Sequence, residues 1–157
     1  MIAHDWRRMV DFYVRVFGCQ PLDPERDLSG AWLEDGTGVR GAHIRGRHLR
    51  MPGHGDEGPT LEVFGYDEVL PQAPPAANRA GFAHLAFAVP DVAAALRAVV
   101  DAGGSAQGAV VSHEVPGAGV LTFTYAADPE SNLIELQHWA PAVAPGGRDL
   151  PDAAAAR

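Results

Sequence analysis

The chain has 157 residues, of which 46% are hydrophobic, and this length is enough for one domain with a real core. Its formal net charge of −8 argues against a nucleic acid as partner. The apolar runs are too short to span a membrane, the N-terminus lacks the pattern of a signal peptide, and a single cysteine excludes an internal disulfide framework. These features favour the cytoplasm.

Two predicted helices share one pattern. The first runs from about Asp5 to Phe17, and the second runs from about Asp91 to Ala102. Each begins at an aspartate suited to cap a helix and is followed by glycine. A constant offset of 86 relates six positions: Asp91 to Asp5, Val92 to Trp6, Ala95 to Met9, Leu96 to Val10, Val99 to Tyr13 and Gly104 to Gly18. The offset indicates a duplicated module.

Short strands are predicted around each helix. In the first half they are residues 31–35, 39–45 and 60–66, with a turn at Gly36-Thr37-Gly38. In the second half they are residues 82–89, 109–115, 119–126 and 132–138. Only Ile2-Ala3-His4 precedes the first helix cap, so the first strand of that half is a stub.

These elements predict an α+β fold built from two βαβββ modules. The modules are residues 1–66, with a truncated first strand, and residues 80–139. A Pro- and Ala-rich linker at 67–79 joins them, and an irregular tail at 140–157 follows.

One histidine and two glutamates interrupt apolar strands. They are His84 in Gly81-Phe82-Ala83-His84-Leu85-Ala86-Phe87, Glu62 in Thr60-Leu61-Glu62-Val63-Phe64, and Glu135 in Asn132-Leu133-Ile134-Glu135-Leu136. A buried carboxylate without a partner is costly, so it pairs, neutralises or binds a metal. Two carboxylates and one imidazole in strand centres indicate a shared metal site.

The doubled unit resembles the vicinal oxygen chelate superfamily, which includes glyoxalase I, methylmalonyl-CoA epimerase, extradiol dioxygenases, and the fosfomycin and bleomycin resistance proteins. The resemblance covers about residues 2–139 and rests on segments 5–13, 58–62, 81–87 and 128–136. It implies a glyoxalase-like curved mixed sheet around a cavity, with a metal held by the first and last strands of both modules. By this resemblance His84, Glu62 and Glu135 are ligands of a divalent Zn, Ni, Co, Fe or Mn ion.

Two positions depart from that pattern. The fourth ligand would lie 86 residues before His84, upstream of Met1. We therefore expect either a coding start further upstream that supplies it, or a site with three protein ligands and an extra water. Ser131 stands at a turn where such proteins usually carry Gly, and a positive φ there would cost about 1 kcal/mol.

The leading hypothesis is a metal-dependent lyase or isomerase of the glyoxalase or epimerase type. The metal would chelate two adjacent oxygens of a small substrate, and Glu135 or Glu62 would move a proton. An extradiol-type dioxygenase fits less well, because its iron would need a second histidine. The competing hypothesis is a metal-free drug- or metabolite-binding protein, similar to the bleomycin resistance proteins. A homodimer is expected, because each module leaves sheet edges that need cover.

Other residues have weaker cases. His43, His48 and His54 are expected in loops or at strand ends, as pocket walls rather than metal ligands, and Cys19 is expected to be a packing residue. A run of arginines either faces solvent or captures the carboxylate or phosphate of a substrate; it contains Arg40, Arg45, Arg47 and Arg50.

Overall fold

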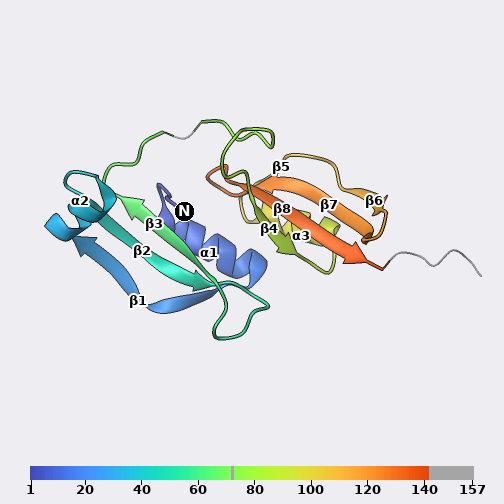
Figure 1. The fold of residues 1–157 in the computed structure, drawn as a ribbon, viewed down its shortest axis with the longest axis horizontal. Coiled ribbons are helices and arrows are strands. Elements are labelled where there is room, and N and C mark those ends of the chain that lie inside the picture. Colours follow the sequence, from blue (N-terminus) through green and yellow to red (C-terminus); the bar gives the residue numbers. More distant parts are fainter. Residues whose placement is uncertain (72, 142–157) are drawn as a thin grey trace, which may run out of the picture.

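Two β-sheets make up most of the computed structural model of this chain, which describes residues 1–71 and 73–141 (Figure 1). The first sheet is antiparallel and contains β1 (Gln20–Ser29), β2 (His43–Arg50) and β3 (Thr60–Tyr66), in that order. The second sheet has the order β4-β8-β7-β5, and β6 pairs with β7. Its strands are β4 (Leu85–Ala88), β5 (Ser105–Ala106), β6 (Val111–Val115), β7 (Gly119–Ala127) and β8 (Leu133–Ala140). The α+β fold class predicted from the sequence is confirmed.

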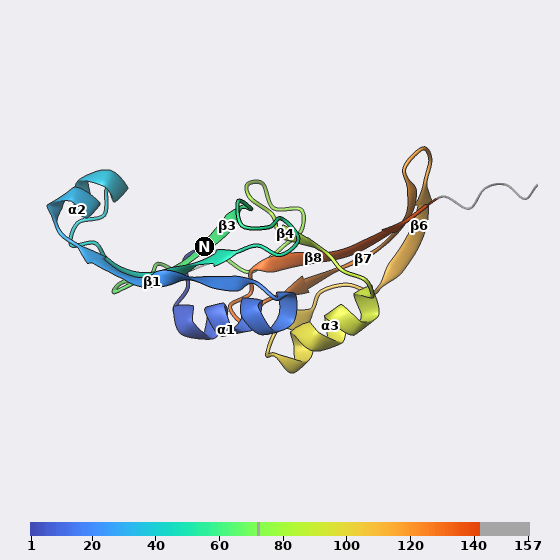
Figure 2. The ribbon, with the colours of Figure 1, turned by 90° about the horizontal axis from the view of Figure 1, so that it is seen from below.

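Two helices lie on the same side of both sheets (Figure 2). They are α1 (Trp6–Phe17) and α3 (Val92–Asp101). At opposite ends of the molecule, α2 (Ala31–Thr37) and the β6–β7 hairpin curve toward the other side. One face of each sheet is therefore left uncovered by α1 and α3.

In the part of the chain that the structure describes, no helix is long and apolar enough to cross a membrane.

The two long helices begin as the sequence predicts. The carboxylate of Asp5 accepts the N–H of Arg8 at 3.0 Å, and that of Asp91 accepts the N–H of Ala94 at 2.9 Å. At the end of α1, Gly18 has a φ of 70°, a left-handed conformation that favours glycine. Equivalent caps at Asp5 and Asp91 are what the internal repeat predicts.

One hydrophobic core joins the two halves. Phe17 of α1 stacks on Phe87 of β4 with ring centroids 3.8 Å apart, and the ring of Tyr13 lies 6.1 Å from the same partner. Buried residues from both sheets belong to this cluster, among them Leu49, Val63, Ile134 and Leu136. Because the same apolar cluster spans both halves, removing the contact between them would expose core residues to water.

A turn of the second half also holds α1 through a buried carboxylate. Asp128 accepts the hydroxyl of Tyr13 at 3.0 Å and the side-chain amide of Asn132 at 2.8 Å. It accepts the backbone N–H groups of Glu130 and Asn132 as well. Burial raises the pKa of Asp128, while these hydrogen bonds act in the opposite direction. The buried charge is therefore well supplied with donors.

The same turn binds the start of α1 from outside. Both oxygens of Glu130 accept backbone N–H groups, from His4 and from Asp5, each at 2.7 Å. Ser131 has a φ of 69°, as its position in the turn predicts, and is the only non-glycine residue with positive φ among the described residues. We call residues 128–132 the latch, because they link the second half to α1 of the first.

The structure corrects the prediction for residues 31–35. They belong to helix α2 rather than to a strand, because Leu33 turns inward and is buried in a small cluster with Ala42, Ile44 and Phe64. The predicted turn around Gly36-Thr37-Gly38 is the end of this helix, and Gly38 terminates it with a φ of 71°. The strand predicted at 39–45 begins later, at His43, and continues to Arg50.

Strand β1 has no counterpart among the predicted elements. Its ten residues are mostly exposed and include two prolines, and its register against β2 shifts between Leu22 and Arg26. An edge strand tolerates proline because one of its sides forms no ladder. A polar edge strand lacks the alternation on which prediction depends.

The first strands of the two halves differ. β4 forms four parallel pairs with β8, from Leu85↔Ile134 to Ala88↔Gln137. In the first half, Ile2 makes one isolated parallel bridge to Phe64. β4 is shorter than the predicted strand at 82–89, so His84 lies one residue before it. Of the tail predicted at 140–157, residues 142–157 lie outside the described residues.

Candidate functional site

The second sheet places two of the predicted site residues together. His84 Nε2 lies 3.0 Å from Glu135 Oε2, and the two side chains are 27% and 16% exposed. Parallel pairing of β4 with β8 sets Ala86 beside Glu135, and His84, two residues before Ala86, reaches the same carboxylate. The partly buried charge of Glu135 therefore has an imidazole as its partner.

Tyr125 adds a phenol to this pair. It lies directly opposite Glu135 in the β7–β8 register, and its ring meets the imidazole of His84 edge-on at 5.0 Å. Burial, together with the Glu135 carboxylate, raises the pKa of Tyr125, so the hydroxyl stays protonated at neutral pH. Sequence analysis missed this residue. The predicted strands 119–126 and 132–138, paired as a hairpin, would have pointed to it.

Aromatic side chains continue along the same face of the second sheet. Phe123, two residues from Tyr125, lies opposite Gln137, with its ring 6.1 Å from that of Tyr125. Trp139, two residues further along β8, is 45% exposed and donates its indole N–H to Gln137 at 3.0 Å. Residues two apart in a strand share a face, so these rings form a row next to Glu135. Exposed apolar surface of this kind marks binding sites.

Glu62 lies in a different pair, on the first sheet. The β2–β3 register places it opposite His48, whose Nε2 is 3.6 Å from Glu62 Oε1. Its side chain is 59% exposed. His48 lies inside β2 rather than in a loop or at a strand end, and its ring packs edge-on against Phe64 at 5.7 Å. The predicted trio is therefore divided, with His84 and Glu135 on one sheet and Glu62 on the other.

The donors present fit a divalent metal as a pair and not as a full set. Across residues 1–71 and 73–141, no group of three or more His, Cys, Asp or Glu side chains is placed to hold a metal ion. Neighbouring ligand atoms that each lie about 2.1 Å from one ion are about 3.0 Å apart in an octahedral site and about 3.4 Å apart in a tetrahedral one. The 3.0 Å between His84 Nε2 and Glu135 Oε2 matches the octahedral value, and it is also the distance of a direct ion pair. They can supply two ligands, and further ones must come from elsewhere.

The remaining candidates from the sequence are Cys19 and the arginine run, and most of them either pack in the core or form ion pairs. Cys19 is buried, as predicted, and burial raises the pKa of its thiol to about 11. Three of the four arginines in the basic run pair with aspartates: Arg45 with Asp67, Arg47 with Asp23 and Arg50 with Asp56. Arg40 forms no ion pair or hydrogen bond with the described residues, so anion capture remains open only for this position.

Comparison with known proteins identifies what the fold resembles. The model of the Glyoxalase/Bleomycin resistance protein/Dioxygenase superfamily matches residues 1–136. A solved glyoxalase family protein from Bacillus cereus is 17% identical with a TM-score of 0.75, over 88% of this chain and 89% of that one. One from Enterococcus faecalis is 21% identical with a TM-score of 0.55, over 87% and 90%. A glyoxylase/bleomycin resistance protein/dioxygenase domain from Frankia is 16% identical with a TM-score of 0.56, over 88% and 92%. No curated protein gives a match.

Proposed function

Because this chain belongs to the glyoxalase/bleomycin resistance protein/dioxygenase superfamily, we propose that it is a divalent-metal-dependent enzyme of the glyoxalase or epimerase type. The observation that carries the proposal is the contact of His84 with Glu135 at 3.0 Å, beside the protonated hydroxyl of Tyr125. An imidazole, a carboxylate and a hydrogen-bond donor thus share one sheet face that α1 and α3 leave uncovered. Such a set suits proton transfer next to a substrate carbonyl.

Each residue of the face has a role in this proposal. His84 and Glu135 hold the ion through an imidazole nitrogen and a carboxylate oxygen, and the bound ion supplies Lewis-acid chemistry. Glu135 also moves the proton on the carbon next to the substrate carbonyl. The hydroxyl of Tyr125 donates a hydrogen bond to a substrate oxygen. Phe123 and Trp139 contact the apolar part of the substrate and exclude water.

Glu62 enters the proposal through a homodimer. In one chain it lies with His48 on the first sheet, apart from His84 and Glu135. A second copy that lays its first sheet against the second sheet of this one would add a Glu62 carboxylate and cover the exposed Trp139. Light scattering at micromolar concentration measures the mass, and a monomer would remove this source of a third ligand.

Metal retention tests the ligands. The purified chain is loaded in turn with Zn, Ni, Co, Mn or ferrous iron and dialysed, and its metal content is measured by mass spectrometry. His84→Ala should lower the occupancy by at least about tenfold. The control is His138→Ala, because that imidazole faces the carbonyl of Val89 at 3.1 Å instead of Glu135. Equal occupancy in His84→Ala and wild type would reject His84 as a ligand.

Proton exchange tests the chemistry without naming the substrate. Small α-oxo and α-hydroxy carbonyl compounds are incubated with metal-loaded protein in deuterated water, and loss of the C–H signal next to the carbonyl is followed by NMR. Glu135→Gln should slow exchange by about a hundredfold or more. Glu114→Gln, an exposed change on β6, is the control. Exchange at the control rate in Glu135→Gln would remove Glu135 from the proton transfer.

Metal-free ligand binding is the second candidate function. It is favoured by the row of Phe123, Tyr125 and Trp139, and by the lack of a three-donor group within the described ranges. The same metal measurement separates the two. Wild-type protein that retains no ion after dialysis, yet binds aromatic small molecules with a change in Trp139 fluorescence, would make metal-free binding the better conclusion.

A further inference from the structure

A cleft of about 740 Å³ opens between the two halves, outside the cluster of His84, Glu135 and Tyr125. It is lined by residues 39–43, residues 66–70, Ile2, His4, Glu130 and Asn132. In Figure 1 the segment after β3 leaves the first sheet and arches toward the second. We call this hollow the seam cleft. Its volume is in the range of pockets that enclose small organic ligands.

Exposed apolar side chains gather in the seam cleft. Leu70 is 79% exposed, Ile2 is 47% exposed and Val39 is 45% exposed, and all three line it. They come from three separate segments of the chain, so their meeting is a product of the fold. Single exposed apolar residues need no explanation, but three that converge on one hollow favour a ligand with an apolar body.

Most charged groups of the seam cleft are already occupied. Both oxygens of Glu130 accept backbone N–H groups. Asp67 accepts from His43 and Arg45. Arg40 and Glu68 are the two charged side chains of the lining without a partner among the described residues.

Of the two unpaired charges, Arg40 also has free backbone donors beside it, which favours an anionic ligand. Arg40 and Gly41 form the corner of a turn that the N–H of Ala42 closes on the carbonyl of Val39 at 3.2 Å. The N–H groups of Arg40 and Gly41 make no hydrogen bond within the described ranges. A guanidinium next to unpaired backbone N–H groups suits a carboxylate, which accepts several charge-assisted hydrogen bonds.

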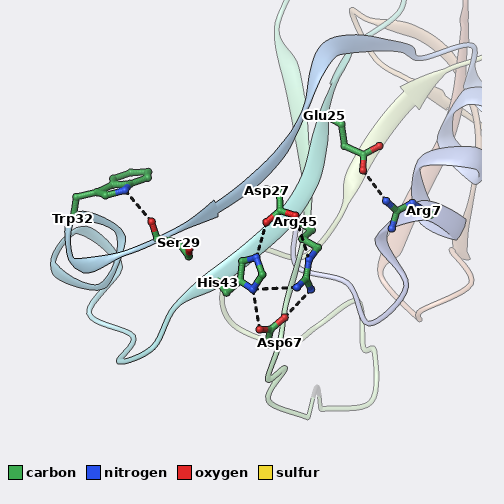
Figure 3. A network of polar contacts seen from close by, with 8 residues as sticks. All are labelled: Arg7, Glu25, Asp27, Ser29, Trp32, His43, Arg45 and Asp67. Atoms are coloured by element: carbon green, nitrogen blue, oxygen red, sulfur yellow. Dashed lines mark hydrogen bonds and ion pairs between the residues drawn. The ribbon is translucent and has the colours of Figure 1, made fainter.

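A polar network holds one wall of the seam cleft in place (Figure 3). His43 Nε2 lies 2.6 Å from Asp27 Oδ1, and His43 Nδ1 lies 2.9 Å from Asp67 Oδ2. Arg45 also donates to Asp67 at 2.7 Å. The imidazolium donates to both carboxylates, whereas a neutral imidazole donates to only one and leaves its other nitrogen to accept from Arg45 Nη2 at 3.1 Å. Because Asp67 follows β3, the network ties the start of segment 67–70 to the first sheet.

We propose that the seam cleft is a binding site for a small apolar carboxylate. The carboxylate pairs with the guanidinium of Arg40 and the nearby backbone N–H groups, and the apolar body lies against Ile2, Val39 and Leu70. Glu68 repels an anion at its own position and so sets the orientation of the ligand. The site shares no lining residue with the His84–Glu135 cluster, so it does not depend on the proposed enzyme activity.

The test measures dissociation constants of naphthoate by isothermal titration calorimetry on the full chain. Naphthylmethylamine and naphthalene methanol serve as the cationic and neutral counterparts. Naphthoate should bind the wild type at least about tenfold more tightly than either, as expected for charge-assisted hydrogen bonds. Arg40→Gln should weaken naphthoate binding by about tenfold or more, whereas the exposed Arg97→Gln on α3 should leave it unchanged. Thermal melting confirms that both variants are folded.

Two further variants complete the test. Leu70→Asp changes a mostly exposed side chain and should abolish naphthoate binding while the protein stays folded. His84→Ala should leave naphthoate affinity unchanged. Loss of binding in His84→Ala would place the probe on the open sheet face and overturn the proposal. Unchanged affinity in Arg40→Gln, or an amine that binds as tightly as naphthoate, would overturn it too.

Discussion

The first half of the chain leaves its strand glutamate at the surface, whereas the second half partly buries its own. The side chain of Glu62 is 59% exposed and that of Glu135 is 16% exposed. The first strands account for the difference. β4 runs beside β8 for four residue pairs and brings His84 to Glu135, while a single bridge from Ile2 gives Glu62 no comparable cover. A repeated sequence pattern therefore need not produce a repeated site.

The halves also differ in the length of the segment between the main helix and the last strand. Asp5 and Asp91 are 86 residues apart, but Glu62 and Glu135 are only 73 apart, so the first half contains 13 more residues in this interval. It uses them for the long β1 and for α2, which form a second small apolar cluster around Leu33. The second half has short β5 and the β6–β7 hairpin instead. The shared plan is thus confined to the main helix and the last two strands of each half, which pair antiparallel as β2–β3 and β7–β8.

The largest expected effect comes from breaking the latch between the halves. Asp128→Ala removes a buried carboxylate and leaves the Tyr13 hydroxyl and the donors of Asn132 without their acceptor. We expect the free energy of unfolding to fall by about 3–5 kcal/mol, as for other buried charged networks that lose one member. Urea denaturation monitored by circular dichroism measures it.

An aspartate on α1, the helix that the latch holds, serves as the control for that loss of stability. Asp11 is exposed on α1, and Asp11→Ala should change the free energy of unfolding by about 0.5 kcal/mol or less. A loss in Asp128→Ala no larger than in Asp11→Ala would show that the apolar contacts of Phe17 and Phe87 alone join the halves.

Sequence patterns predicted the elements that are both periodic and capped. α1 and α3 have aspartate caps and apolar residues at helical spacing, and β3, β7 and β8 have apolar centres. The sequence patterns did not predict β1, because an exposed edge strand has no apolar face to reveal it. The sequence of α2 does not reveal a helix, because seven residues are too few to show a helical period and the one buried residue, Leu33, is fixed by tertiary contacts.

The site was predictable only within one sheet. His84 and Glu135 stood out because polar residues in apolar strands need partners, and adjacent strands bring them together. Tyr125 was missed because a tyrosine in a strand shows no anomaly until the register places it opposite Glu135. The position of Glu62 relative to that pair depends on how the two sheets sit, and no local pattern carries this information. Metal ligation by all three residues stays a prediction.

The helix caps offer a direct measure of what the halves share. Asp5→Ala and Asp91→Ala each remove one cap, with contacts of 3.0 and 2.9 Å to the third residue of the helix. Each should cost about 1 kcal/mol of unfolding free energy, and the two losses should be similar. Chemical denaturation of the two single variants checks this. A loss at Asp5 well above that at Asp91 would show that the Glu130 contact depends on the same cap.

Exchanging serine and glycine in the turn before the last strand should change stability in opposite directions in the two halves. Ser131 has a φ of 69°, so Ser131→Gly should raise the free energy of unfolding by up to about 1 kcal/mol. Gly58 lies 73 residues earlier without positive φ, and a Cβ there would come within 2.5 Å of the Cβ of His54. Gly58→Ser should therefore destabilise the protein. Thermal melts of both variants are the measurement, and a destabilised Ser131→Gly would mean that the serine makes a compensating contact.

The smallest expected effect is a pH dependence that belongs to the first half alone. The hydrogen bonds to Asp27 and Asp67 raise the pKa of His43, and the bonds to His43 are the main cause that lowers the pKa of each aspartate. A raised pKa in the folded state means that the imidazolium stabilises the protein fully below about pH 6.5. This contribution is lost as the pH rises through the folded-state pKa. The aspartates give the opposite trend in acid, where their contribution disappears as the pH falls below about 4.

Thermal unfolding of wild type and His43→Gln, compared from about pH 5 to about pH 8.5, isolates the contribution of the His43 charge to stability. The melting temperature of the wild type should exceed that of His43→Gln at the acidic end, and the gap should narrow as the pH rises. High salt should shrink the gap, because the groups around His43 are largely exposed. His113→Gln, a change on the exposed strand β6 of the second half, should show no such narrowing. A gap that is constant with pH would mean that His43 stabilises the first sheet by packing and not by its charge.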